Sequence, residues 1–421
     1  MSAVPAPPLS VTGASLDGHP IDIRCEDGAI VAIGADAAPQ PGDERIEARG
    51  APLVPPLCNG HTHAAMTLFR GYADDLPLME WLEEWIWPAE ARLEAEDVYW
   101  GARLACVEMI RTGTARFWDL YWHPEATARA VVDAGLRATI GAPLIELGTS
   151  GSELRRAALE SLDRLDGSGP EIAPALSPHS IYMVGEDTLR WVGEVAAERR
   201  LPVHLHLSET EKEVRDCLDA HGERPAAYLD RLGLLGERTL LAHGVWLDEG
   251  ELELIAGRGA TVVTNPVANM KLAVGGVFPY PQARAAGVRV GLGTDGPGSN
   301  NSLDLLADVK LFALAQKHAA GDPAAIEARE AWEIACGAAS PLLGGSARLE
   351  AGSAADFLLL RPEAAELSLG DLYAGLVYAA SGAIVDTTVV AGRVLMRGGR
   401  VEGEGEIVAR VKERAQRLGV I

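Results

Sequence analysis

The chain has 421 residues, and its 37 basic and 60 acidic side chains give a net charge of −23 at neutral pH. An apolar content of 48% provides for a large core and excludes disorder as the main state. The acidic balance argues against a nucleic acid or an anionic membrane as a partner. The sequence shows no signal peptide, no membrane-spanning run and only five scattered cysteines, so we expect a cytoplasmic protein with reduced thiols.

Short apolar segments separated by turns occupy both ends of the chain. Three strands are predicted near the start and three near the end: Leu9–Thr12, Ile21–Cys25, Ile30–Gly34, Asp356–Leu360, Ile384–Val390 and Arg393–Met396. The apolar residues of Ile407–Leu418 recur at helical spacing and predict a surface helix. We expect residues 1–53 and 351–421 to form one composite β-sandwich domain that includes this helix.

The middle of the chain alternates short apolar runs with amphipathic helical stretches. The runs are Leu53–Leu57, Thr114–Leu120, Ala138–Ile145, Ile172–Leu176, Val203–Leu207, Leu240–Ala242, Thr261–Thr264 and Val288–Leu292. Such alternation predicts parallel strands joined by helical crossovers. Eight units favour a (β/α)8 TIM-type barrel over residues 54–350, in the α/β class. An open doubly wound sheet is the alternative, but no GxGxxG follows the first run.

Histidines fall where the predicted strands end, which is where barrels build their active sites. His61 and His63 follow the first run, and residues two apart on an extended chain point to the same side. The pair could therefore grip one metal ion. Read alone, the two histidines could instead be polar residues in the turn after Asn59-Gly60.

A second group lies on the run at Val203–Leu207. Its alternation predicts apolar side chains toward the helices and His204, His206 and Ser208 toward the barrel interior. Buried polar groups need partners, which a metal ion would supply. Glu209, at the strand end, could shuttle protons. The plainer alternative is one hydrogen-bonded core histidine beside a surface glutamate.

Two further strand ends carry His243 and Asp295. Asp295 could ligate a metal ion and accept a proton from its bound water, or it could serve as a turn residue before Gly-Pro-Gly. His243 could likewise make only a backbone hydrogen bond. Four strand ends that all carry ligand-type residues favour a metal site over these separate explanations.

Histidine and aspartate together suit zinc or ferrous iron. In an open site such an ion lowers the pKa of a bound water to about 7. The five lysines all fall outside the predicted barrel strands, so none is placed to bridge two ions. We therefore expect one divalent ion per chain, zinc in preference to iron.

These motifs resemble those of the amidohydrolase superfamily, and within it the branch that deaminates 5′-methylthioadenosine and S-adenosylhomocysteine and includes chlorotriazine hydrolases. The resemblance covers nearly the whole chain. It rests on the segments Pro55–His63, His204–Glu209, Ala242–Gly244 and Gly293–Asp295, together with Ser299–Ser302.

The resemblance implies roles that the residues alone leave open. It makes His61, His63, His206 and Asp295 the metal ligands and places His204 behind them. It implies that Glu209 protonates the ring nitrogen beside the attacked carbon. His243 would hold the attacking hydroxide, and Asp295 would pass its proton to the leaving amine.

The substrate pocket of the family maps onto four further residues. Trp81 and Glu90 match positions that pack on the nucleoside and bind the ribose hydroxyls, and His179 matches a substrate contact from the fourth strand. Ser299 would touch the base, or instead cap the helix that begins near Leu303. The neighbouring Trp85 and Trp87 could be core residues or part of an interface between copies of the chain.

The sequence differs from some members of this branch in a residue that would contact the substituent on the 5′ carbon of the ribose. Members that accept S-adenosylhomocysteine resemble one another in having an arginine near the end of the third strand, where this chain reads Ile140–Glu146 without one. Arg155 and Arg156 lie further on. We therefore expect a preference for adenosine, 5′-deoxyadenosine or 5′-methylthioadenosine.

The sequence predicts a hydrolase that takes a small-molecule substrate, with a homo-oligomer as a possible assembly. A deaminase or chlorohydrolase of guanine, pterin or triazine rings is the alternative within the superfamily. A hydantoin-type amide hydrolase is disfavoured by the missing strand lysine. A metal-binding barrel without catalysis is disfavoured because Glu209, His243 and Asp295 are all present.

Overall fold

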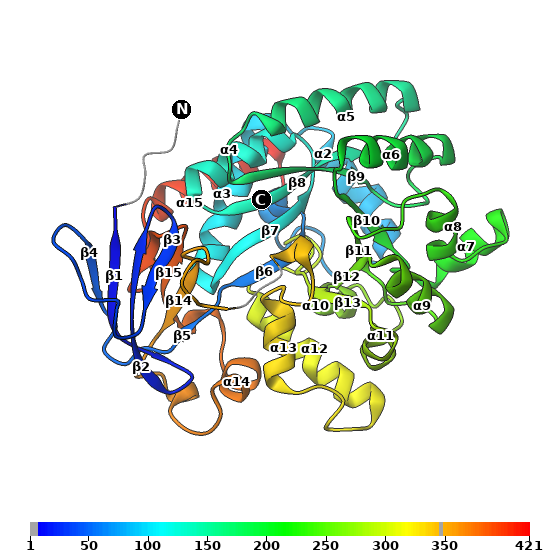
Figure 1. The fold of residues 1–421 in the computed structure, drawn as a ribbon. Coiled ribbons are helices and arrows are strands. Elements are labelled where there is room, and N and C mark those ends of the chain that lie inside the picture. The colour runs from blue at the N-terminus through cyan, green and yellow to red at the C-terminus, as the bar shows by residue number, and fades with distance from the viewer. Residues whose placement is uncertain (1–6, 345–347) are drawn as a thin grey trace.

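Eight parallel strands form a barrel in the computed structural model of the protein, which describes residues 7–344 and 348–421 (Figure 1). They are β6 (Leu57–Thr62), β7 (Thr114–Leu120), β8 (Arg137–Leu144), β9 (Ile172–Pro178), β10 (Val203–Leu207), β11 (Thr239–His243), β12 (Thr261–Thr264) and β13 (Arg289–Leu292). Each pairs with the next along the chain. The ring closes just beyond β13, where the Asp295 amide donates to the His61 carbonyl over 3.0 Å. The predicted barrel is confirmed.

Helices surround the barrel in chain order (Figure 1). The longer ones are α3 (Ala95–Thr112), α4 (Pro124–Ala134), α5 (Gly151–Asp166), α6 (Glu186–Arg199), α7 (Glu211–His221), α9 (Glu249–Arg258) and α12 (Leu305–Ala320). Shorter ones are α8 (Pro225–Arg231), α10 (Pro266–Lys271), α11 (Tyr280–Ala286), α13 (Ala328–Ala335) and α14 (Leu372–Ala374). After β6 the chain forms a 3-10 helix (Ala64–Phe69), then α1 (Leu78–Glu80), π-helical turns (Trp81–Ile86) and α2 (Trp87–Glu90).

The first barrel strand was predicted in the wrong place. The apolar run Leu53–Leu57 does not form it. Instead, Leu53–Val54 form β5, which pairs antiparallel with β14 (Phe357–Leu360), and the barrel strand begins at Leu57. Pro55 and Pro56 separate the two strands because neither proline has an N–H to donate to a sheet. His61 therefore lies within β6 and His63 directly after it.

The two chain ends meet in two antiparallel-rich sheets beside the barrel, as predicted for the small sandwich (Figure 1). One holds β1 (Leu9–Leu16), β2 (His19–Glu26), β3 (Ala29–Ile33) and β4 (Glu44–Glu47). The other holds β5, β14, β15 (Val385–Val390), β16 (Arg393–Arg397) and β17 (Arg400–Val401). The exact domain limits at 53/54 and 350/351 remain a prediction.

Strand β14 is buried on both faces, which explains its uninterrupted apolar sequence. Phe357 and Leu359 pack in the sandwich core with Leu9 and Ile23 of the first sheet. The alternate residue Leu358 packs in the core that lies between the barrel and its helices. The strand thus connects the two cores.

The last helix, α15 (Glu404–Leu418), packs chiefly on the barrel helix α3. Arg417 forms an ion pair with Asp97 and donates to the Arg92 carbonyl over 2.9 Å. Arg92 in turn donates to the Leu418 carbonyl over 2.7 Å. The C-terminal helix therefore holds the segment that directly follows Glu90.

All five cysteines are buried and unpaired, in keeping with the predicted reduced thiols. The lysines lie on helices α7, α10, α12 and α15, so no barrel strand carries one. Across residues 7–344 and 348–421, no helix is both long and apolar enough to cross a membrane.

Candidate metal and catalytic site

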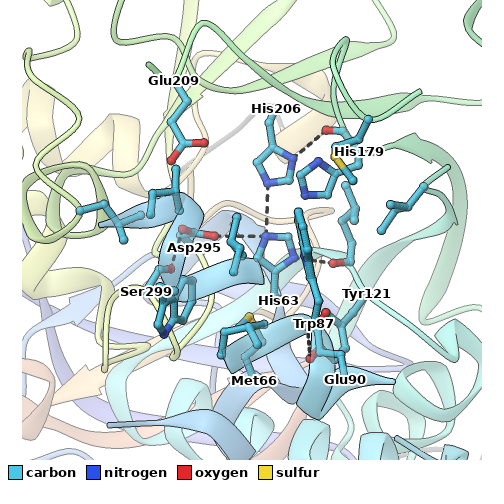
Figure 2. A pocket seen from close by; sticks show the side chains of 18 of the residues that line it. His63, Met66, Trp87, Glu90, Tyr121, His179, His206, Glu209, Asp295 and Ser299 are labelled. Atoms are coloured by element: carbon cyan, nitrogen blue, oxygen red, sulfur yellow. Dashed lines mark hydrogen bonds and ion pairs between the residues drawn. The ribbon is translucent and has the colours of Figure 1, made fainter. Parts of the chain in front are cut away.

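Three imidazoles and one carboxylate converge at the carboxyl end of the barrel. His61, His63, His206 and Asp295 each direct one potential ligand atom to the same point, and these atoms lie within 4.8 Å of one another. Asp295 Oδ1 is 3.3 Å from His61 Nε2 and 3.2 Å from His63 Nε2. Figure 2 shows His63, His206 and Asp295 facing one another across the cavity.

The other ring nitrogen of each histidine is held from behind. His63 Nδ1 lies 2.5 Å from the Leu120 carbonyl, and His206 Nδ1 lies 2.7 Å from the His179 carbonyl. A carbonyl only accepts hydrogen bonds, so both Nδ1 atoms carry the proton. His61 Nδ1 lies 2.8 Å from Nε2 of His204, in the barrel interior.

This arrangement leaves the inner nitrogens as lone pairs that face each other. His63 Nε2 and His206 Nε2 are 3.2 Å apart, and the carboxylate of Asp295 adds only acceptors. His61 Nε2 is fully buried and makes no hydrogen bond of acceptable geometry. Converging acceptors without a donor repel one another unless a cation lies between them, so the four residues fit a divalent metal ion.

The electrostatics of the cluster agree with this for Asp295 and His61. At His63, burial alone would lower the pKa, but the Asp295 carboxylate raises it to about 9. Burial alone would raise the pKa of Asp295, but the adjacent rings of His61 and His63 hold it well below its usual range. Burial lowers the pKa of His61 to about 4. A carboxylate and a neutral imidazole are the forms that bind a metal ion.

Backbone strain is concentrated at the same strand ends. Ser208, His243 and Asp295 have φ angles of 49°, 74° and 62°, in the left-handed region that non-glycine residues rarely adopt. Such conformations cost free energy and persist where the surrounding structure enforces them. Here they turn the side chains of His243 and Asp295 into the cavity.

Glu209 and His243 stand beside the cluster and line the same cavity. Glu209 Oε2 is 3.9 Å from His243 Nε2. Burial raises the pKa of the Glu209 carboxyl, which favours its protonated form and suits a proton donor. Glu213 accepts hydrogen bonds of 2.9 Å from the backbone amides of Ser208 and Glu209, which fixes the chain at this strand end.

The four residues expected to contact substrate also line this cavity: Trp81, Glu90, His179 and Ser299. They come from the segment after β6, from the end of β9 and from the loop after β13. Trp87 lines the cavity as well, whereas Trp85 is 41% exposed. An interface between copies of the chain at Trp85 remains a prediction.

Ser299 does not cap a helix. Its hydroxyl donates to Asp295 Oδ2 over 2.6 Å, and the N-cap of α12 is Asp304. Ser299 therefore orients the carboxylate whose other oxygen faces the histidines.

Several residues of the site were missed by the sequence analysis. Tyr121 and Trp122 directly follow β7, line the cavity and hydrogen-bond to Glu90. Asn269 holds His243, and buried Asp119 accepts from the Ala64 amide directly after His63. An aspartate within the apolar run Thr114–Leu120, followed by Tyr-Trp at the strand end, was the available signal.

The titratable side chains that line the cavity are acidic residues, histidines and tyrosines. Among its lining residues in the described part of the chain, none is a lysine or an arginine. Arg155 lies on α5 and donates to the Gly151 carbonyl over 3.2 Å. Lys212 and Lys271 line an adjoining cavity, where they pair with Asp216 and Asp74.

Comparisons with known proteins agree with this geometry. Residues 53–395 match the model of the amidohydrolase family. The chain is 45% identical to a 5′-deoxyadenosine deaminase of Methanoregula boonei, covering 97% of this chain and 95% of the relative. It is 40% identical to a 5-methylthioadenosine/S-adenosylhomocysteine deaminase of Archaeoglobus fulgidus, covering 94% and 95%. A zinc-bound adenosine deaminase structure from Xanthomonas campestris superposes with a TM-score of 0.91 at 33% identity, covering 98% of each chain.

Proposed function

Since the chain belongs to the amidohydrolase family, we propose that it is a metal-dependent deaminase of adenine nucleosides. It would convert adenosine, 5′-deoxyadenosine or 5′-methylthioadenosine, with water, to the inosine analogue and ammonia. One observation carries most weight: His63, His206 and Asp295 of the metal-type cluster share a cavity with two further acids, the buried Glu209 and the half-buried Glu90. The names of the relatives point to the same class of substrate.

His61, His63, His206 and Asp295 would hold one divalent ion, zinc in preference to iron. When bound, such an ion supplies a water that is acidic enough to act as a nucleophile at neutral pH. His204 would act from behind by fixing the ring of His61, to which it is hydrogen-bonded.

Three residues would move or hold the protons. Glu209 would donate a proton to the ring nitrogen beside the attacked carbon, for which its raised pKa is suited. Asp295, ionised because of its lowered pKa, would accept the proton of the attacking water and deliver it to the departing amine. His243 would hold the attacking water by accepting a hydrogen bond from it at Nε2.

Four residues would position the nucleoside. Trp81 would stack on the purine, and Ser299 would touch its edge beside Asp295. Glu90 would accept hydrogen bonds from the ribose hydroxyls, and His179 would contact the substrate from the end of β9.

A cavity without lysine or arginine among its described lining residues supports a preference for small, uncharged 5′ groups. An amino-acid tail such as that of S-adenosylhomocysteine carries a carboxylate, and no lysine or arginine among the described lining residues stands ready to pair with it.

An ammonia-release assay on metal-analysed protein tests the proposal. The panel holds adenosine, 5′-deoxyadenosine, 5′-methylthioadenosine, S-adenosylhomocysteine, guanine and a chlorotriazine. We expect conversion of the first three with about one metal ion per chain. Activity on guanine or triazine alone would overturn the nucleoside assignment, and a highest kcat/KM for S-adenosylhomocysteine would overturn the 5′ preference.

A further inference from the structure

Glu90 is held by two side chains of the neighbouring strand end. Tyr121 Oη donates to Glu90 Oε1 over 2.7 Å, and Trp122 Nε1 donates to Glu90 Oε2 over 3.1 Å. Each carboxylate oxygen therefore has one donor from the protein. Figure 2 shows Tyr121 and Glu90 together at the edge of the cavity.

The free acceptor positions of Glu90 suit a vicinal diol. An ionised carboxylate offers about four lone-pair positions, and Tyr121 and Trp122 fill one on each oxygen. One position on each oxygen is left for a hydroxyl donor. Two neighbouring hydroxyls, as on a ribose, could then bind both oxygens at once.

We propose that Tyr121 and Trp122 are positioning residues that make the site selective for a ribose with both hydroxyl groups, by locking the Glu90 carboxylate. This inference rests on the proposed function and extends it to two residues with no role assigned so far. A glutamate side chain otherwise loses considerable rotational freedom on binding. Because Tyr121 and Trp122 already restrain the Glu90 side chain before binding, less conformational entropy is lost when the nucleoside binds.

The stretch Leu120–Trp122 links the ribose subsite to the metal cluster. The carbonyl of Leu120 accepts from His63 Nδ1, and the next two side chains hold Glu90. The stretch Leu120–Trp122 thus sets the distance between the reacting end and the sugar end of a bound nucleoside.

The test compares adenosine with 2′,3′-dideoxyadenosine, which lacks both hydroxyls. For Tyr121→Phe and Trp122→Phe we expect KM for adenosine to rise about tenfold, the usual cost of a lost hydrogen bond to a charged group, with kcat nearly unchanged. The kcat/KM for 2′,3′-dideoxyadenosine should stay near the wild-type value. In a Glu90→Ala background, Tyr121→Phe should add no further change for adenosine.

The chain offers matched controls outside the cavity. Tyr99 Oη donates to Asp133 over 2.9 Å and Trp100 Nε1 donates to Glu96 over 2.8 Å. Tyr99→Phe and Trp100→Phe therefore remove the same kinds of hydrogen bond and should leave both substrates unaffected. Thermal midpoint and metal content, measured on every variant, verify that Tyr121→Phe and Trp122→Phe are folded and loaded.

Two outcomes would overturn the inference while leaving the proposed function intact. One is an equal loss on both substrates, which would place the effect at the base or at His63. The other is an unchanged KM for adenosine in both variants. Wild-type protein that is inactive on adenosine, 5′-deoxyadenosine and 5′-methylthioadenosine would overturn the proposed function itself, and the inference with it.

Discussion

His243 Nδ1 lies 2.8 Å from the amide oxygen of Asn269, in the first helix after β12. An amide oxygen only accepts, so Nδ1 carries the proton and Nε2 is left to face Glu209 and the cavity. A buried amide thus selects which tautomer of the imidazole meets the substrate.

Removing this acceptor should slow the reaction. Asn269→Ala leaves the buried Nδ1–H of His243 without a partner and frees the ring to rotate or change tautomer. We expect kcat to fall about 10- to 100-fold while KM and metal content stay near wild type. Asn269→Asp keeps an acceptor and should recover part of the rate; steady-state kinetics on both variants checks this. A normal kcat for Asn269→Ala would show that the tautomer is fixed by other means.

Glu209→Gln separates proton donation from metal binding. The amide keeps the shape of the side chain, and Glu209 is not among the residues of the metal cluster. We expect about a 100- to 10,000-fold loss of kcat, the usual contribution of a general acid, with metal content unchanged. Normal turnover in this variant would remove Glu209 from the mechanism.

Asp295→Asn should impair both metal retention and rate. The change removes the negative charge that faces His61 and His63 and weakens the acceptor for the Ser299 hydroxyl. We expect substoichiometric metal after dialysis and at least about a 100-fold loss of kcat even when metal is added back. Full metal content together with full activity would mean that Asp295 is only a turn residue.

Removal of the metal should also destabilise the fold. The inner nitrogens and the Asp295 carboxylate then face one another without a cation. At a free metal concentration 1,000 times the Kd, binding adds about 4 kcal/mol to the free energy of unfolding. Chelation should therefore lower the thermal midpoint and abolish deamination, and added zinc should restore both. His206→Ala serves as the control, because its midpoint should respond much less to the chelator.

Glu213 should make stability depend on pH. Burial raises its pKa from 4.5 to about 8, although the amides of Ser208 and Glu209 oppose the shift. The folded state therefore favours the protonated Glu213 carboxyl. The contribution of this group to the free energy of unfolding is lost as pH rises from about 4.5 to about 8. Between these limits the unfolding free energy of the wild type should fall relative to Glu213→Gln, by at most roughly 1.4 kcal/mol per pH unit. Denaturant titrations of both proteins across this range measure the difference, and parallel curves would contradict the shifted pKa.

The residues of the candidate site that could be predicted from the sequence share one property. His61, His206, His243 and Asp295 are polar side chains at the ends of apolar runs, where periodicity places them inside a barrel. Period-two alternation also assigned His204 to the interior, and the structure places it against His61.

The parts that were missed depend on contacts between distant segments. Tyr121 meets Glu90 across 31 positions of sequence, and Asn269 meets His243 across 26. No local pattern marks such a pair, since each residue alone resembles an ordinary loop or helix residue. The misplaced first strand has a different cause, because the apolar run before Pro55 supplies an edge to one sheet and the run after it begins another.

The contact between α15 and the segment after Glu90 has a consequence for biosynthesis. Arg92 and Arg417 tie the segment that follows Glu90 to a helix more than 300 positions further along the chain. During translation the barrel strands and the four residues of the metal-type cluster emerge well before Leu418. The nascent protein should therefore be able to capture its metal before it can bind a nucleoside properly, and the sugar side of the pocket would be the last part of the enzyme to mature.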